Sequence, residues 1–468
     1  MFPVEPSAEA MAFDSVLCRE LAGGGVYAVG GRVRDQVIAE LGGSPAATLD
    51  LDYLITGLNL EDIIAKLSPI GRAELVGAAF GIVKFTIDGV TADIALPRRE
   101  WSTGTHHRDF RIESAPDIPI EEDLARRDFR INMMARDVRI GRLVDPHGGR
   151  ADLQAKRLDI LIPETFVEDP LRILRGAQLA ARFDLVPTPA TINAMKAASH
   201  LLSTVAPERV ADELTKLLVR ARNPSVGFEL IRHVGGLELV LPELAEGWNV
   251  DQNQYHAHTV YYHSLYTCDA APSELVLRLA ALFHDVGKPR TKDGPHFYNH
   301  QIVGAEMTRQ ALSRLRFSND VVDRVCRLVA QHMYSAVDEL TDAAVRRFIR
   351  RVGLENVDAL FALRHADVAA TGLAPRSLEE NARFEKRVRL QIEGRHAFSL
   401  AELAIGGDDV IAIMRTAGVV GSEYHGDRRI GAALQHALER VLDDPSRNEP
   451  AALRAIVRAH LGLDRQGE

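Results

Sequence analysis

Two aspartates, Asp50 and Asp52, lie two positions apart within the apolar run LDLDYLITG. Side chains two residues apart in a strand point to the same face, so a strand here would present two carboxylates together. Such carboxylates repel each other unless a cation lies between them, and oxygen ligands favour Mg²⁺ or Mn²⁺. Asp93, in VTADIAL, lies on a second predicted strand and would complete a two-metal site. An isolated pair of this kind also occurs in surface strands and turns, so its surroundings must decide.

A pair of glycines precedes these aspartates and favours a binding role. Gly30 and Gly31 end the strand-like run VYAVGG, and Arg34 follows one turn into a predicted helix. Two glycines let a ligand approach the backbone closely, and a helix N-terminus offers free N–H groups to phosphate. Arg34 is placed to bond phosphate oxygens with both arms of its guanidinium. A glycine pair alone indicates only a tight turn, but together with the two aspartates it predicts a phosphate site beside a metal.

The motif EDPLR opens a predicted helix and places Asp169 three residues before Arg172, so the two share a face. A carboxylate only accepts hydrogen bonds, and a guanidinium only donates them. Cytosine and adenine present an amino donor beside a ring-nitrogen acceptor, whereas uracil and guanine present the opposite polarity. The pair would therefore accept C and A and reject U and G without a template. The alternative is an ordinary ion pair on the helix surface.

A second group of potential metal ligands lies in the later half of the chain. These residues are His263, His284, Asp285, His300, His332 and Asp367. Imidazole and carboxylate together suit a transition metal better than Mg²⁺. Asp367 lies on the same helical face as Leu360 and Leu363, so it should point into a helix bundle. A lone histidine on such a face is usually a core residue, but the whole set predicts a second metal site.

The elements that must position these groups predict an α+β fold with a mixed α/β head and a long helical body. Strand-like runs are confined to residues 25–150, and residues 32–43 have helical spacing. From residue 163 onward the apolar residues recur with helical period. The expected domains are the α/β head with the carboxylate pair, a helical neck that carries Asp169 and Arg172, a helical domain with the second set of potential ligands, and a helical tail. They cover residues 1–155, 156–245, 246–375 and 376–468 respectively.

The composition is that of a soluble globular protein, with 468 residues, 46% hydrophobic and 26% charged. No signal peptide or long apolar run is apparent, so a cytoplasmic location and no membrane partner are expected. The three cysteines form no CxxC pair, which argues against a disulfide framework or a thiolate zinc site. The net charge of −9 does not exclude RNA, because phosphate binding needs only a local basic surface. Arginine clusters occur at 126/127/130, at 172/175 and at 346/347/350/351.

Six motifs in order resemble those of bacterial CCA-adding enzymes and their poly(A) polymerase relatives. They are YAVGGRVRD, LDLDYLITG, EEDLARRDFRINMMARD, DPHGGRADL, EDPLRILR and PERV, within about residues 25–220. The resemblance implies that Asp50 and Asp52 bind the metal, while Gly31, Arg34 and Arg127 contact the nucleotide.

The same resemblance favours base reading over a surface ion pair for Asp169 and Arg172, and it implies a nucleotide contact for Arg175. The chain departs from the family pattern at Gln178, where the family carries an arginine. Glutamine keeps a hydrogen-bond donor but lacks the charge for one phosphate or helix-bracing contact. Met133 replaces a usual alanine, a change expected to affect packing only.

The reaction that the resemblance implies is attack of a tRNA 3′-hydroxyl on the α-phosphate of CTP or ATP. The implied cofactors are Mg²⁺ or Mn²⁺ at the transferase site and a transition metal at the second set of ligands. This second site is called the HD-type site, after its adjacent residues His284 and Asp285. The HD-type site resembles those of HD-domain phosphohydrolases acting on RNA-end phosphates, or it is a structural remnant. The pattern makes no prediction of an oligomeric state.

Other functions compete with CCA addition. They are poly(A) polymerase, addition of CC or A alone, an HD phosphohydrolase with a degenerate head, and a non-catalytic RNA-binding protein. The intact transferase residues argue against a degenerate head, and two complete sets of metal ligands argue against a protein that only binds RNA.

Overall fold

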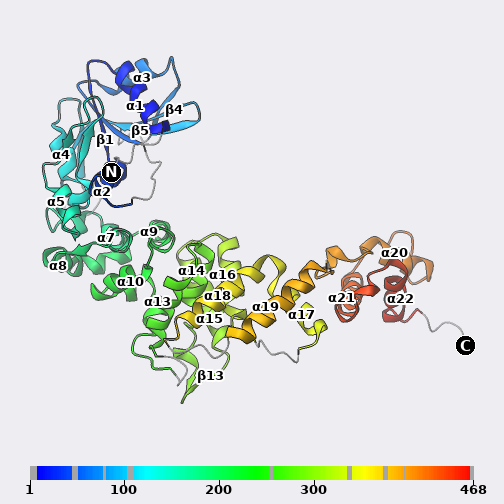
Figure 1. Ribbon diagram of the computed structural model, residues 1–468. Coiled ribbons are helices and arrows are strands. Elements are labelled where there is room, and N and C mark those ends of the chain that lie inside the picture. Colours follow the sequence, from blue (N-terminus) through cyan, green and yellow to red (C-terminus); the bar gives the residue numbers. More distant parts are fainter. Residues whose placement is uncertain are drawn as a thin grey trace, which may run out of the picture. The chain divides into compact units, whose positions relative to one another are not determined.

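The computed structural model describes residues 8–44, 51–76, 81–102, 110–252, 257–334, 340–372, 378–394 and 396–463. The chain forms two compact units. The first consists of Met1–Ala245 with Arg314–Arg316, and the second of Glu246–Ser313 with Phe317–Glu468. Figure 1 labels their elements.

A seven-stranded mixed sheet forms the centre of the head. In spatial order its strands are β3 (Arg72–Val76), β4 (Ile82–Ile87), β5 (Val90–Ala95), β2 (Asp52–Thr56), β1 (Gly25–Val29), β8 (Ala135–Asp137) and β9 (Leu143–Val144). The predicted run IVKFTIDGVTADIAL folds as the hairpin of β4 and β5, with Asp88 and Gly89 at positive φ in its two-residue turn. The pair β2–β5 is parallel, whereas the other pairs of this sheet are antiparallel.

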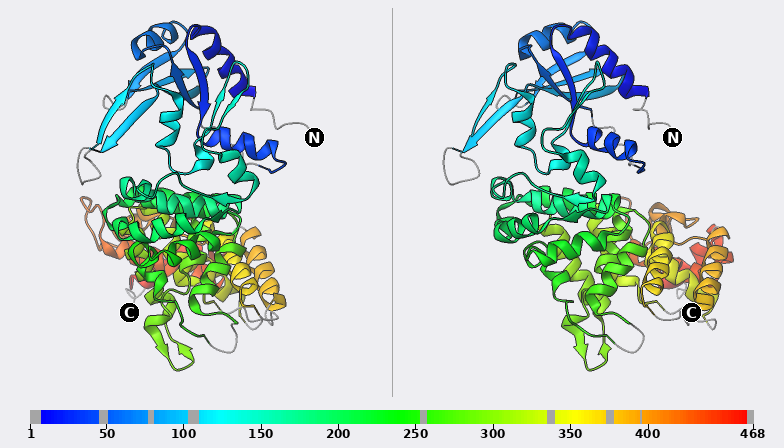
Figure 2. Two further views of the ribbon diagram at one scale, coloured as in Figure 1. Left: turned by 90° about the vertical axis from the view of Figure 1, so that its left-hand side faces the viewer. Right: turned by 60° about the vertical axis from the view of Figure 1, so that its left-hand side comes forward.

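Short helices and a separate hairpin complete the head. They are α1 (Ala8–Glu20), α2 (Gly31–Glu40), α3 (Leu60–Leu67), α4 (Ile120–Ala125), α5 (Gly149–Gln154), β6 (Arg98–Ser102) and β7 (Phe110–Ser114). The hairpin of β6 and β7 is a two-stranded ribbon, cyan in Figure 2. The sequence did not lead us to expect α1, which packs Phe13 against Tyr53 and Phe85 of the sheet. Arg32 of α2 also holds α1, through an ion pair with Asp14.

The rest of the first unit is helical apart from short strands. Its helices are α6 (Thr165–Glu168), α7 (Leu171–Phe183), α8 (Pro189–Ala198), α9 (Pro207–Arg220), α10 (Pro224–His233), α11 (Leu237–Val240) and α12 (Pro242–Ala245). Helices α8, α9 and α10 each begin at a proline, whose fixed φ suits the first helical turn. Helix α7 packs against both α9 and α10 and ends where Asp184 takes a left-handed conformation, with φ 55°. Together β10 (Arg157–Leu158) and β11 (Val186–Pro187) form a small parallel pair.

The second unit confirms the helical body that the periodicity predicts. Its helices are α13 (Val260–Ala270), α14 (Leu275–Phe283), α15 (His300–Arg314), α16 (Asn319–Gln331), α17 (Asp342–Val352), α18 (Val357–Ala369), α19 (Leu378–Glu393), α20 (Gly407–Thr416), α21 (Arg428–Asp443) and α22 (Pro450–His460). A short antiparallel hairpin precedes α15. Its two strands, β12 (Lys292–Asp293) and β13 (His296–Phe297), have two residues each. The apolar helix α14 contacts α13, α16 and α18, which makes it the centre of the bundle. Within the part of the chain that the structure describes, no helix has the length and apolar character of a membrane span.

The arginine cluster of α17 holds a neighbouring helix. Arg346 donates hydrogen bonds to the backbone oxygens of Leu442 and Asp443, at 2.7 and 3.0 Å, where α21 ends. Arg347 and Arg350 form ion pairs with acidic side chains of α21. A cation at a helix C-terminus meets unpaired carbonyls and the negative end of the helix dipole. These arginines therefore anchor the tail helix rather than form an open basic surface.

Candidate active site and metal centre

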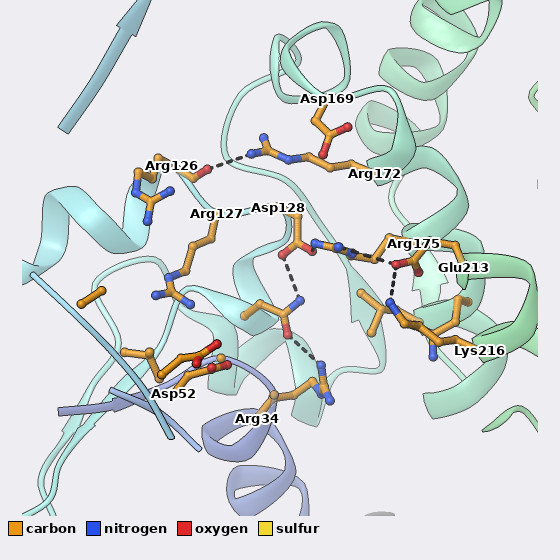
Figure 3. A pocket seen from close by; sticks show the side chains of 18 of the residues that line it. Arg34, Asp52, Arg126, Arg127, Asp128, Asp169, Arg172, Arg175, Glu213 and Lys216 are labelled. Carbon is orange, nitrogen blue, oxygen red and sulfur yellow. Dashed lines mark hydrogen bonds and ion pairs between the residues drawn. The ribbon is translucent and has the colours of Figure 1, made fainter. Parts of the chain in front are cut away.

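A cavity of about 680 Å³ in the first unit collects the predicted transferase residues. Its walls come from the sheet, from α2, from the segment after α4, and from α7 and α9 (Figure 3). The predicted residues that line it are Gly30, Gly31, Arg34, Asp52, Asp93, Arg127, Asp169, Arg172 and Arg175. Asp50 lies outside the described residues.

The two described carboxylates of the predicted metal site lie on adjacent strands. Asp52 of β2 and Asp93 of β5 are register partners in the parallel pair, and the backbone N–H of Asp93 donates to the oxygen of Leu51 at 2.9 Å. Paired positions in neighbouring strands direct their side chains to the same face of a sheet. Both residues line the cavity, so their oxygen donors fit a hard divalent cation such as Mg²⁺.

Gly30 lets the backbone pass close to the Asp52 carboxylate. Its φ of 74° and ψ of −144° are rarely adopted by residues with a side chain. A Cβ atom at this position would lie 3.2 Å from Oδ2 of Asp52 and 3.8 Å from Nη1 of Arg127. The predicted glycine turn is therefore built against the carboxylate of the metal site.

Replacing Gly30 with alanine should lower the kcat of nucleotide addition at least tenfold while the protein stays folded. The new methyl group crowds Asp52 and adds backbone strain on the order of 1–3 kcal/mol. The matched control is Gly42→Ala, at a positive φ of 86°, where no described residue lies within 4 Å of the added Cβ. Comparison of kcat and Tm for the two variants checks the prediction, and equal activities would contradict it.

A buried carboxylate that the sequence did not single out fixes the arginines of the third motif. Asp123, fully buried, accepts from Nη2 of Arg126 on one oxygen at 2.8 Å and from Nη2 of Arg127 on the other at 3.1 Å. Burial alone would raise the pKa of Asp123, but the charges of Arg127 and Arg126 outweigh it and hold the pKa below its ordinary value. Asp123 therefore stays ionised and holds Arg127, whose side chain lines the cavity. Figure 3 shows Arg127 at this wall.

The predicted base-reading residues are held by partners other than each other. The Asp169 carboxylate accepts from Nη2 of Arg209 at 2.8 Å and from the N–H of Leu171 at 3.3 Å. Arg172 donates to Oγ1 of Thr165 at 2.5 Å and to the backbone oxygen of Arg126 at 3.2 Å. Among the described contacts, the surface ion pair that the spacing also allowed is not formed. Both side chains instead line the cavity (Figure 3).

Gln178, at the position where the family pattern has an arginine, also lines the cavity. Its side chain is buried, and its Nε2 atom has no hydrogen-bond partner among the residues that the structure describes. Arg182, one turn further along α7, brings a guanidinium to the same wall and lies 3.6 Å from a carboxylate oxygen of Asp35. Arg182 thus places a positive charge on the cavity wall near the position where Gln178 lacks one.

The cavity carries a charge opposite to that of the whole chain. The described residues that line it include nine arginines and lysines but five aspartates and glutamates, whereas the chain has a net charge of −9. Several of the basic residues escaped the sequence analysis because they lie outside the motifs' assigned positions: Arg98, Arg182, Lys216 and Arg220. An excess of positive charge in a concave site attracts a polyanion such as a nucleoside triphosphate.

The second unit brings all six HD-type residues into one buried cluster. They form two groups in which the potential ligand atoms lie within 4.8 Å of one another, namely His263, His284 and Asp367, and Asp285, His300 and His332. Asp285 faces both groups. Its Oδ2 atom lies 3.2 Å from Nε2 of His284, and its Oδ1 atom lies 3.4 Å from Nε2 of His300. The donor set of imidazoles and carboxylates fits transition metals.

Two ligands of this cluster, His332 and Asp285, are in the protonation state that metal binding requires. Burial would lower the pKa of His284, but the charge of Asp285 raises it above its ordinary value. Burial, and then the charge of His284, lower the pKa of His332 to about 3, so its imidazole is neutral. Burial would raise the pKa of Asp285, but His284 and Lys288 hold it well below its ordinary value. Neutral imidazole and ionised carboxylate are the forms that ligate metals. Lys288, which the sequence analysis did not assign, donates to Oδ2 of Asp285 at 2.5 Å.

A glycine turn beside paired carboxylates, faced by an arginine-lined helix, defines a nucleotidyltransferase of the polymerase type. Family models match the chain in three segments: the poly A polymerase head domain at residues 26–159, the probable RNA and SrmB-binding site of polymerase A at 184–247, and the HD domain at 231–373. The multifunctional CCA protein of Cupriavidus pinatubonensis is 35% identical over 344 residues, which cover 70% of this chain and 79% of that protein. The multifunctional CCA protein of Burkholderia ambifaria is 34% identical over 409 residues, covering 83% and 95%. The chain belongs to the family of CCA-adding tRNA nucleotidyltransferases.

Solved structures share this fold. The CCA-adding enzyme of Bacillus stearothermophilus in complex with CTP matches with a TM-score of 0.68 and 21% identity, over 100% of both chains. A Thermotoga maritima CCA-adding enzyme complexed with tRNA matches with a TM-score of 0.55 and 20% identity, over 98% of this chain and 97% of that one. The predicted α+β class, with a transferase head and a helical body, is confirmed.

Proposed function

We propose that the 680 Å³ cavity of the first unit is where this enzyme adds C, C and A to the 3′ end of tRNA from CTP and ATP. The observation that carries the proposal is the meeting of two sets of residues in one cavity. The carboxylates and the glycine turn come from the head, and the base-reading residues come from α7. A reacting phosphate and the base of the same nucleotide can therefore be held at once.

Asp52 and Asp93, with Asp50, would hold Mg²⁺ or Mn²⁺. Such a metal, when bound, lowers the pKa of the attacking hydroxyl and neutralises charge on the triphosphate. The 3′-oxygen of the tRNA forms a bond to the α-phosphorus, the bond from that phosphorus to the bridging oxygen breaks, and pyrophosphate leaves. Arg34, Arg127 and Arg175 bind phosphate oxygens and hold the α-phosphorus in line with the hydroxyl.

Asp169 and Arg172 select the base in this proposal. The Asp169 carboxylate accepts a hydrogen bond from the amino group of cytosine or adenine, and the Arg172 guanidinium donates one to the neighbouring ring nitrogen. Arg209 and the N–H of Leu171 fix the carboxylate, while Thr165 and the backbone of Arg126 fix the guanidinium. Side chains that are held in this way read a base without a template strand.

Replacing Asp169 with asparagine should relax base selection. An amide both accepts and donates, so it can turn its donor toward the carbonyl of uracil or guanine. We expect the ratio of kcat/KM for CTP over UTP to fall about 10- to 100-fold, because each mispaired polar group costs about 1–3 kcal/mol. Single-nucleotide incorporation into tRNA measures the ratio. Asp184→Asn at the end of α7, where a left-handed residue tolerates asparagine, is the control. An unchanged ratio would contradict the base-reading role.

A second activity is favoured by the six-residue cluster of the second unit. It would be a metal-dependent phosphohydrolase acting on 2′,3′-cyclic or terminal phosphates of RNA ends. These six residues would hold a transition metal, with the two oxygens of Asp285 facing the two groups of ligands. When bound, such a metal would supply a water molecule of lowered pKa and would stabilise negative charge on the leaving oxygen.

The division of labour that we propose follows the predicted domains. Residues 1–155 bind the metal and triphosphate, 156–245 select the nucleotide, 246–375 carry the HD-type site and 376–468 form the tail. The predicted cytoplasmic location stays a prediction.

A further inference from the structure

A chain of polar contacts runs along the cavity wall from Arg34 to α9. Asn132, at the end of the short turn η1 (Arg130–Asn132), accepts a hydrogen bond on Oδ1 from Nη1 of Arg34 at 2.9 Å. Its Nδ2 atom donates to Oδ1 of Asp128, also at 2.9 Å. Asn132 itself lines the cavity. None of the functions proposed above uses this residue, although it lies within the third motif.

The contacts continue beyond Asp128 to the base-reading helix (Figure 3). Nη1 of Arg175, on α7, donates to Oδ2 of Asp128 at 3.3 Å. Nη2 of Arg175 lies 3.6 Å from Oε1 of Glu213, and Nζ of Lys216 donates to the same oxygen at 2.8 Å. Elements α2, η1, α7 and α9 are thus joined by side chains that alternate in charge, with the neutral Asn132 among them.

The amide of Asn132 satisfies both of its neighbours at once. Arg34 and Asp128 are buried, so the folded state is destabilised if a hydrogen-bonding group of either is left unpaired. The carbonyl oxygen of Asn132 accepts from the cation, and its NH₂ group donates to the anion. An aspartate would place a second carboxylate against Asp128, and a leucine of similar volume would leave both partners without this bond.

The contacts also fix the direction of the Arg34 guanidinium. Nε and Nη2 of Arg34 donate to the single oxygen Oδ1 of Asp35, at 2.9 and 2.7 Å, and Nη1 donates to Asn132. The rigid, planar guanidinium is therefore held at two separate points. A guanidinium held on both sides binds phosphate with little further loss of conformational freedom.

We propose that Asn132 is a positioning residue for nucleotide binding. It holds Arg34 in place for the triphosphate and ties it through Asp128 to Arg175. The proposal rests on the proposed function of the cavity. Asn132 acts through its neighbours and takes no part in the bond-making step.

The test is steady-state kinetics of CTP and ATP addition to tRNA by the full chain. We expect Asn132→Leu to raise KM for both nucleotides about tenfold, the loss of roughly one hydrogen bond to a charged group, with kcat changed less than about threefold. Asn132→Asp should raise KM further. The exchanged double variant Asp128→Asn/Asn132→Asp restores one amide beside one carboxylate, so its KM should fall below that of Asn132→Asp.

A control and the contrary outcomes complete the design. Asn59→Asp exchanges the same side-chain types at the N-cap of α3, where either oxygen accepts from the N–H of Asp62, and should leave KM unchanged. An unaltered KM in Asn132→Leu would overturn the positioning role, as would a double variant no better than Asn132→Asp. If Asn132→Leu does not fold, the comparison of Asn132→Asp with the double variant still decides. The parent enzyme is assayed in parallel, and its failure to add C and A would refute the proposed function instead.

Discussion

Asp52→Asn should reduce nucleotide addition by at least about 10³-fold while leaving the fold and the HD-type activity intact. Asparagine keeps the size of the side chain but removes the negative charge that a divalent cation requires. Because Asp52 begins β2 and is only partly buried, the exchange should cost little stability. The measurement is the single-turnover rate of CMP addition to tRNA, with Tm as the test of folding.

The matched control for Asp52 is Asp88→Asn, in the turn between β4 and β5. Its φ of 50° is one that asparagine tolerates as well as aspartate, so activity should not change. If Asp52→Asn kept more than a tenth of the parent rate, the Asp52 carboxylate would not belong to the proposed metal site. Loss of both activities would show that the two sites are not independent.

His284→Ala should produce the opposite pattern. The exchange removes one ligand of the first HD-type group and leaves Asp285 its ion pair with Lys288, so the second unit should stay folded. We expect the transition-metal content, measured by elemental analysis after dialysis, to fall by at least one ion per chain. Hydrolysis of a 2′,3′-cyclic phosphate at the end of an RNA oligonucleotide should fall at least about 100-fold. Nucleotide addition should be unchanged.

His296→Ala is the control for this prediction. His296 is exposed and stacks on Tyr298 outside the two ligand groups, so its loss should alter neither metal content nor hydrolysis. If His284→Ala kept the full metal content, the cluster would be a packed group of polar residues rather than a metal centre. If the metal were lost but the parent enzyme showed no hydrolysis, the metal would be structural only.

The parts of the site that could be predicted are those that depend only on residues close together in the sequence. The glycine turn, the Asp52 strand and the opening of α7 each depend on neighbouring residues, and local periodicity gave their elements. The six HD-type residues were also found, because each lies in a recognisable short segment. The periodicity did not reveal α1, which is only weakly amphipathic, and it could not give the partners of the charged residues.

Those partners depend on contacts between distant positions. Arg34 meets Asn132 across 98 residues, and Arg346 meets the end of α21 across 96. Asp123, although it lies only three and four residues from the arginines that it fixes, was overlooked because its burial follows from packing rather than from spacing. The arginine cluster of α17 is a case in which the sequence suggested a free basic surface that the fold does not leave free. A basic run that could have faced RNA is engaged by a helix that follows it in the chain.

The most direct test of the central claim is the sequence of the products made from tRNA that lacks its CCA end. The enzyme is incubated with CTP alone, with ATP alone and with both, and the 3′ ends are sequenced. We predict two C residues with CTP alone, and C, C and A in that order with both nucleotides, with Asp52→Asn adding nothing. Long A tails without C, or addition that ignores the identity of the base, would contradict the account.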